Sequence, residues 1–308
     1  MSRFQAGRKL NPVLPGLFAL AGWHPALSVA WGQTRDLGDD LGRLNVRHST
    51  EHYRLAGTVS DVQLAEFGRC LEYIYTEYAK GFGKLLDKPS DDTASAEDKR
   101  FDVVILAKQK EYEEFRQAYF GVYSEHTSGL YIPRAQLLLI SAAGPLDETY
   151  EVIFHEAFHQ FVDRFIPAMP TWVNEGLATY YGTARPTKGG LVFDRPRRGF
   201  FRIVRDATSA KKLIPFEELL SYDRASFYQR DPIEGVSFDR RILSYAQSYT
   251  LCAYLLSDSG GRKHLQKYLR ALAQARNTAT ARQATLESFP AKLLESLVPG
   301  WLEFVNRN

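Results

Sequence analysis

ETYEVIFHEAFHQFVDRFIPAMPTWVNEGLATYY, residues 148–181, is the stretch that decides the fold of the C-terminal half of the chain. Glu148 to Phe165 contains neither glycine nor proline and predicts one long helix. Pro167 and Pro170 end it, because proline lacks a backbone donor and clashes inside a helix. Trp172 to Tyr181 predicts a second helix, which the break allows to fold back against the first.

The first predicted helix carries the pattern H-E-x-x-H, with His155 and His159 four residues apart. This spacing places the two imidazoles about 40° apart around the helix axis and about 6 Å apart along it, so both can reach one ion. Neutral imidazole suits zinc, and a catalytic zinc keeps three protein ligands and an open position. Glu156 lies beside the same stripe, where it can accept a proton from water. Apolar neighbours indicate a buried helix, whose polar groups need a partner such as a metal.

The third metal ligand is predicted from outside the first helix. Glu151 and Asp163 share the stripe, but adding either one would spread the ligands over about 12 Å of axis. Glu175 is the better candidate, because it lies in the first turn of the helix that folds back. Glu151 and Asp163 then remain as carboxylates that orient a histidine or as ordinary surface ion pairs.

These features together resemble the gluzincin metallopeptidases, whose second helix carries a W-x-N-E-G-x-A pattern. Here that pattern reads Trp172-Val173-Asn174-Glu175-Gly176-Leu177-Ala178. The resemblance implies one zinc ion held by His155, His159 and Glu175, with Glu156 as the catalytic base. The spacer between the two motifs is a few residues shorter than in the large aminopeptidases of that group. The chain also lacks their G-x-M-E-N signature, which favours an endopeptidase-like enzyme.

A tyrosine near the metal is a further expectation from the resemblance. Residues 244–249 read SYAQSY and resemble the family's Y-x-K-G helix, which makes Tyr245 the candidate donor to the oxyanion. Gln247 and Ser248 replace the family's lysine and glycine. Tyr249 and Tyr180 are the alternative donors, and a structural role in the core is the alternative for Tyr245 itself.

The remaining pattern predicts an α+β fold with a small N-terminal α/β part, residues 40–145, and a mainly helical part, residues 146–308, that carries the metal site. Ser60 and Gln63 fit a capping box at the start of a helix. The other predicted elements of the N-terminal part are strands within 43–54, 101–107, 129–132 and 136–141 and a helix over 110–120. The order of elements across about residues 45–275 is similar to bacterial peptidase-MA-like domains, which implies a zincin-like arrangement.

The strand at residues 136–141 precedes the metal-site helix. It could pair with an extended peptide by strand addition, or it could be an internal strand of the sheet.

Composition excludes several classes of protein. Of 308 residues, 44% are hydrophobic and 24% are charged, which is ordinary for a globular chain. The net charge of +3 is too small for a nucleic-acid-binding surface. One basic cluster could attract an acidic partner or could be a solvated surface: Arg195, Arg197, Arg198, Arg202, Arg205, Lys211 and Lys212.

Cys70 and Cys252 lie in apolar helical stretches and are expected to be buried free thiols, although a disulfide is compatible with the sequence. Residues 1–35 form a signal peptide or an N-terminal tail. Basic residues precede an apolar run that ends in Ser28-Val29-Ala30, which favours export to the periplasm or the exterior over a cytoplasmic location. Prolines interrupt the run, so no integral membrane span is expected.

The sequence therefore predicts a zinc-dependent metallopeptidase that acts on a peptide or protein. A non-catalytic binding or scaffolding module that keeps zinc for stability is the alternative, because a fold does not guarantee an activity.

Overall fold

The computed structural model describes residues 44, 46–82, 100–120 and 127–308. The predicted export segment, residues 1–35, lies outside these ranges. The described part is a mixed α/β structure with one five-stranded sheet, followed by a helical C-terminal part. This confirms the predicted α+β class in its broad form.

The sheet has the strand order β1-β2-β3-β5-β4. Its strands are β1 (Val46–Ser49), β2 (Tyr53–Gly57), β3 (Phe101–Leu106), β4 (Gly129–Ile132) and β5 (Leu137–Ser141). The three inner strands β2, β3 and β5 are parallel, whereas β1 and β4 run antiparallel at the two edges. A short turn over Pro133–Ala135 joins β4 to β5, as the proline between the two predicted strands indicates.

Helices cover both faces of the sheet. Val103 and Ile105 of β3 point to the main core beneath α2 (Asp61–Phe82) and α4 (Leu146–Phe165). Val104 and Leu106 point the other way, into a smaller core beneath α3 (Gln109–Phe120). Because both faces are buried, β3 and β5 read as continuous apolar runs rather than as alternating ones.

The position of β5 decides one question that the sequence left open. Hydrogen bonds join β5 to β3 on one side and to β4 on the other, so it is an internal strand. The interpretation that residues 136–141 pair with a peptide is therefore wrong, because no backbone groups of β5 remain for a further strand. In the described part of the sheet, β4 is the edge strand on this side.

The capping box predicted at the start of α2 is confirmed. Gln63 N–H donates to the Ser60 hydroxyl at 3.3 Å, and Ser60 N–H donates to the Gln63 side chain at 3.3 Å. Further along α2, the buried Tyr78 hydroxyl donates to the Phe154 carbonyl of α4 at 2.6 Å. This bond joins the N-terminal part to the helix that carries the H-E-x-x-H pattern.

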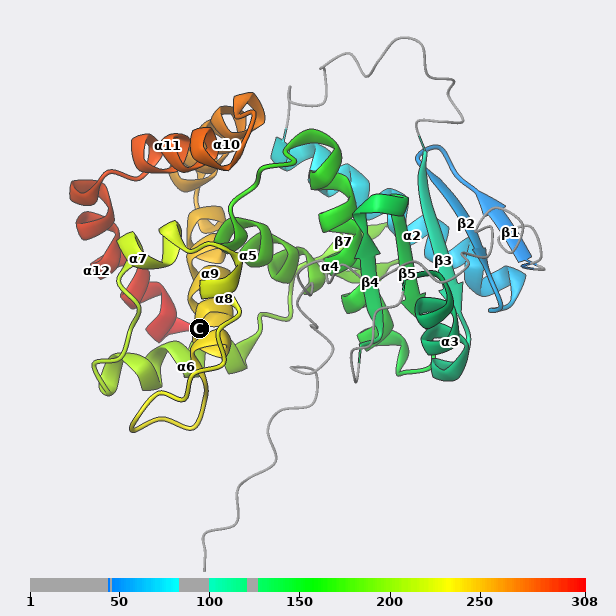
Figure 1. Ribbon diagram of the computed structural model, residues 1–308, viewed down its shortest axis with the longest axis horizontal. Helices are drawn as coiled ribbons and strands as arrows, with labels where there is room; N and C mark the ends of the chain where they lie inside the picture. The colour runs from blue at the N-terminus through cyan, green and yellow to red at the C-terminus, as the bar shows by residue number, and fades with distance from the viewer. Residues whose placement is uncertain (1–43, 45, 83–99, 121–126) are drawn as a thin grey trace, which may run out of the picture.

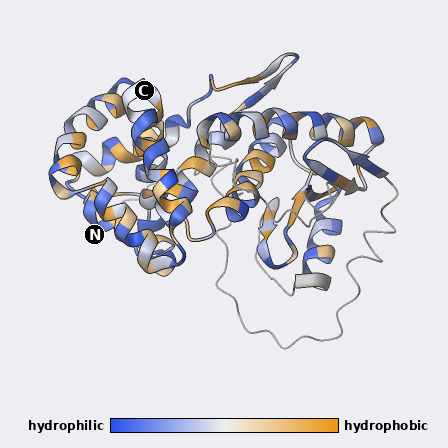
Figure 2. Cartoon of the chain, turned by 90° about the horizontal axis from the view of Figure 1, so that it is seen from above, coloured by the Kyte–Doolittle hydropathy of each residue, from blue (hydrophilic) through white to orange (hydrophobic). Residues whose placement is uncertain are grey.

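The C-terminal part is built around α5 and α9, which pack along each other (Figure 1). Its helices are α5 (Thr171–Gly182), α6 (Arg198–Ser209), α7 (Phe216–Ser221), α8 (Arg224–Phe227), α9 (Arg240–Ser257), α10 (Ser259–Gln274), α11 (Thr278–Ser288) and α12 (Ala291–Arg307). Figure 2 shows mixed polar and apolar colouring along most of these helices, as expected for helices with one buried side.

Two further elements of this part lie near the metal-site helices and the pocket. A hairpin, β6 (Arg185–Thr187) and β7 (Gly190–Val192), connects α5 to α6. Helix α11 contains threonines and has weak apolar periodicity, which are untypical of a helix. Asn277 caps it, and only Ala281 and Thr285 are fully buried. None of the helices in the described ranges is long and apolar enough to cross a membrane.

Candidate metal centre

His155 and His159 point from α4 toward Glu175 in the first turn of α5. Their Nε2 atoms lie 3.1 Å apart. Nε2 of His155 is 3.5 Å from Glu175 Oε2, and Nε2 of His159 is 3.8 Å from Glu175 Oε1. One ligand atom from each residue lies within 4.8 Å of the others, and the three side chains are at most 10% exposed. The structure thus brings together the three residues predicted as ligands.

The geometry of this group fits a metal ion. Ligand bonds of about 2.0–2.1 Å in tetrahedral geometry place neighbouring ligand atoms about 3.3 Å apart, close to the separations here. Glu175 Oε2 and His155 Nδ1 are buried without a hydrogen-bond partner among the described residues. Buried polar atoms are rarely left so, and an ion between the imidazoles would engage the carboxylate oxygen.

Asn174 positions one of the histidines. Its Oδ1 lies 3.0 Å from His159 Nδ1, which leaves Nε2 directed at Glu175. The two carboxylates that the sequence offered for this role, Glu151 and Asp163, have other partners. Glu151 pairs with Arg197, and Asp163 accepts from the Tyr131 hydroxyl at 2.8 Å.

The two glutamates of the site have opposite pKa shifts. Burial raises the pKa of Glu156. This effect of burial is larger than the lowering effects of His159 and of the Tyr131 N–H, which donates to Glu156 Oε2 at 3.0 Å. Burial also opposes ionisation of Glu175, but the nearby His159 and His155 and the Tyr228 hydroxyl outweigh it and lower the pKa to about 2. Glu175 is therefore the permanent anion of the site.

Two tyrosines lie next to Glu175. Tyr245 is buried on α9, and its pKa is raised well above the usual range by burial and then by the charges of Glu175 and Tyr228. Tyr228 follows α8, and its hydroxyl donates to Glu175 Oε1 at 2.5 Å. The alternatives lie elsewhere: the Tyr249 hydroxyl accepts from Arg197 N–H, and Tyr180 stacks on Phe193.

Tyr228 is not among the site residues that the sequence predicts. It stands 53 residues beyond Glu175, in a segment with no recognised motif. The one local signal was Asp223, which caps the short helix α8 and so fixes the turn that precedes Tyr228. Capping predicts a helix start but not which side chain reaches the site.

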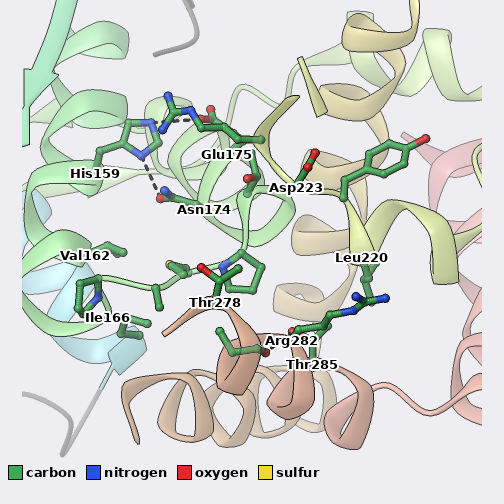
Figure 3. Close-up of a pocket in the computed structure, with 18 of the residues that line it drawn as sticks. His159, Val162, Ile166, Asn174, Glu175, Leu220, Asp223, Thr278, Arg282 and Thr285 are labelled. Atoms are coloured by element: carbon green, nitrogen blue, oxygen red, sulfur yellow. Dashed lines mark hydrogen bonds and ion pairs between the residues drawn. The ribbon is translucent and has the colours of Figure 1, made fainter. Parts of the chain in front are cut away.

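A pocket of about 570 Å³ opens beside the metal centre. Figure 3 shows it bounded by α4 and α5 on one side, by residues Leu220 to Asp223 on another, and by α11 below. His159, Asn174, Glu175 and Tyr228 belong to its lining. The candidate metal centre is thus accessible from a cavity of the size that small ligands and peptides occupy.

Two arginines of the basic cluster form ion pairs with residues of α4. Arg195 pairs with Asp147 at 2.7 Å and Arg197 with Glu151, both at the start of α4, while most of the remaining basic side chains are exposed. This favours a solvated surface for the cluster.

Cys70 and Cys252 are buried free thiols, as expected.

No protein-family profile matches this sequence, and no curated protein matches it closely enough to count as a relative. The residues of the site and their geometry therefore carry the functional proposal.

Proposed function

We propose that this chain is a zinc-dependent metallopeptidase of the gluzincin type. The observation that carries the proposal is the convergence of the Nε2 atoms of His155 and His159 with the Glu175 carboxylate, all within 4.8 Å in a buried place beside an open pocket. Two imidazoles and one carboxylate are the donor set of catalytic zinc sites that keep a position open for substrate.

Each residue has a separate role in peptide hydrolysis. A zinc ion bound there supplies a Lewis acid that polarises the scissile carbonyl and makes water a nucleophile near neutral pH. Tyr131 N–H holds one oxygen of Glu156, and the other oxygen takes the proton from water and passes it to the leaving amine. Tyr245 donates to the oxyanion, with its neighbour Tyr228 holding Glu175 in place.

The edge strand β4 is the place where an extended substrate would bind. It contacts α4, and its Tyr131 N–H donates to Glu156, so a peptide paired with the remaining outer backbone groups of β4 would pass the catalytic base. Strand addition uses backbone hydrogen bonds and therefore accepts many sequences. This replaces β5, whose two sides are both paired.

The substitution Glu156→Gln tests the enzyme directly. We expect purified wild type to bind one zinc per chain and to cleave members of an unbiased peptide library. Glu156→Gln should keep its zinc and lose at least about a hundredfold in rate, since it removes the proton acceptor and no metal ligand. Glu148→Gln is the matched control, because Glu148 is an exposed glutamate in the first turn of the same helix.

The test also separates the proposed enzyme from a non-catalytic module. A wild-type protein that holds one zinc and cleaves no peptide would favour a zinc-stabilised binding or scaffolding role.

Export is proposed from the N-terminal sequence, and N-terminal sequencing of the mature chain checks it: an intact Met1 would contradict cleavage of a signal peptide.

A further inference from the structure

One wall of the pocket beside the candidate metal centre runs along α4. His159 and Val162 stand on the same side of α4, Ile166 is the residue directly after the helix, and all three line the pocket. Seven residues of helix extend about 10 Å, so this wall leads from the metal centre to an apolar end about two turns away. Figure 3 shows these three side chains descending along α4, away from Glu175.

Helix α11 forms the opposite side at the far end. Thr278, Ala281, Arg282 and Thr285 line the pocket and have the spacing i, i+3, i+4, i+7, which is one face of a helix. In Figure 3 the Arg282 side chain extends from α11 toward Leu220. The part of the pocket between α11 and Leu220 thus combines an apolar side chain with one guanidinium group.

The carboxylates that line the pocket are each engaged. Asp163 accepts from the Tyr131 hydroxyl, Glu175 belongs to the metal centre, and Asp223 accepts from Ser226 N–H at 2.8 Å to cap α8. Among the described residues, Arg282 has no carboxylate within ion-pair distance. Its positive charge is therefore available to a ligand in the pocket.

A second arginine lines the pocket in a different position. The guanidinium carbon of Arg224 lies 5.5 Å from the centre of the Tyr228 ring, so its charge is directed at the metal end. Arg282 is the basic side chain contributed by α11.

We infer that the side of this pocket between α11 and Leu220 is a carboxylate-binding subsite in which Arg282 selects substrates that carry an acidic group. Arg282 is exposed to the pocket, and guanidinium binds carboxylate through two parallel, charge-assisted hydrogen bonds. This inference rests on the proposed peptidase function.

The carboxylate could belong to an Asp or Glu side chain or to the C-terminus of the substrate. Matched peptides distinguish these sources. Starting from a peptide that zinc-loaded wild type cleaves, one series exchanges Glu for Gln at each position, and a second compares the free C-terminus with its amide. A loss of rate in the first series identifies a side chain, and a loss in the second identifies the C-terminus.

We expect kcat/KM to be about tenfold higher for the acidic member of the decisive pair, the value of one charge-assisted hydrogen bond at a partly open site. Arg282→Gln should bring this ratio close to one, and Arg282→Lys should give an intermediate ratio, since lysine keeps the charge without the fork. Arg276→Gln is the matched control, because Arg276 is exposed just before α11 and lies outside the pocket lining. Zinc content and thermal unfolding check that each variant is folded.

The outcomes separate the two proposals. Cleavage with no preference for an acidic group, or a preference that survives in Arg282→Gln, overturns the subsite alone. A zinc-loaded wild type that cleaves no peptide overturns the proposed function and the subsite with it.

Discussion

Gly176 follows the candidate ligand Glu175 directly, and the structure gives a reason for a glycine there. A Cβ at Gly176 would lie 2.7 Å from the carbonyl oxygen of Ser248 and 2.7 Å from Sγ of Cys252, both on α9. The carbonyl belongs to helix backbone and cannot rotate away. We therefore predict that Gly176→Ala forces α5 and α9 apart and displaces Glu175.

The expected magnitude follows from two opposing effects. Alanine in a helix interior is favoured over glycine by about 1 kcal/mol. Overpacking against fixed atoms costs about 1–3 kcal/mol, so Gly176→Ala should lower the free energy of unfolding by about 1 kcal/mol. Zinc affinity should fall as well, because metal sites tolerate displacements of only about 0.5 Å.

Gly300 in α12 is the matched control. A Cβ there would meet the Tyr254 hydroxyl at 2.4 Å and Cζ at 3.3 Å, which is the far end of a side chain that can move. Gly300→Ala should therefore be neutral or stabilising by up to about 1 kcal/mol. Urea denaturation followed by circular dichroism measures both variants, and competition with a chelator measures zinc. A Gly176→Ala variant that matches Gly300→Ala in stability and retains wild-type zinc affinity would refute the predicted clash with α9.

Three further predictions concern other residues. Tyr228→Phe removes the hydrogen bond to Glu175 and should weaken zinc binding about tenfold in a chelator competition; an unchanged affinity would remove Tyr228 from the site. Gln247→Leu leaves a buried N–H and C=O of the segment before α7 without partners, and urea denaturation should show a loss of about 2–4 kcal/mol rather than less than 1. Burial raises the pKa of Cys70 to about 11 and that of Cys252 further, so thiolates are scarce at pH 8 and Ellman's reagent should label both thiols only after unfolding; rapid labelling of the native protein would contradict this.

The sequence did not indicate that Tyr228 contacts Glu175. A partial motif match favours Tyr245, which lies next to Glu175, but the short hydrogen bond of 2.5 Å comes from Tyr228, in a segment that no motif marks. The same holds for Asn174, which orients His159 in place of the carboxylates considered. Side-chain partners across segments that are far apart in sequence depend on how helices pack, and that packing is not periodic along the chain.

The sequence by itself determined the two metal-site helices and the candidate ligands. The i, i+4 spacing places His155 and His159 on one side of α4, the proline break ends that helix, and the short connection returns Glu175 to it. These are local effects, set by helix geometry and by proline. The tertiary structure alone decided that β5 is internal, that Tyr228 reaches Glu175, and that α11 closes the pocket with Arg282. Those features depend on contacts between segments that are far apart in the sequence. One pattern of apolar residues is compatible with many arrangements of helices and strands, and only close packing of the whole core selects one of them.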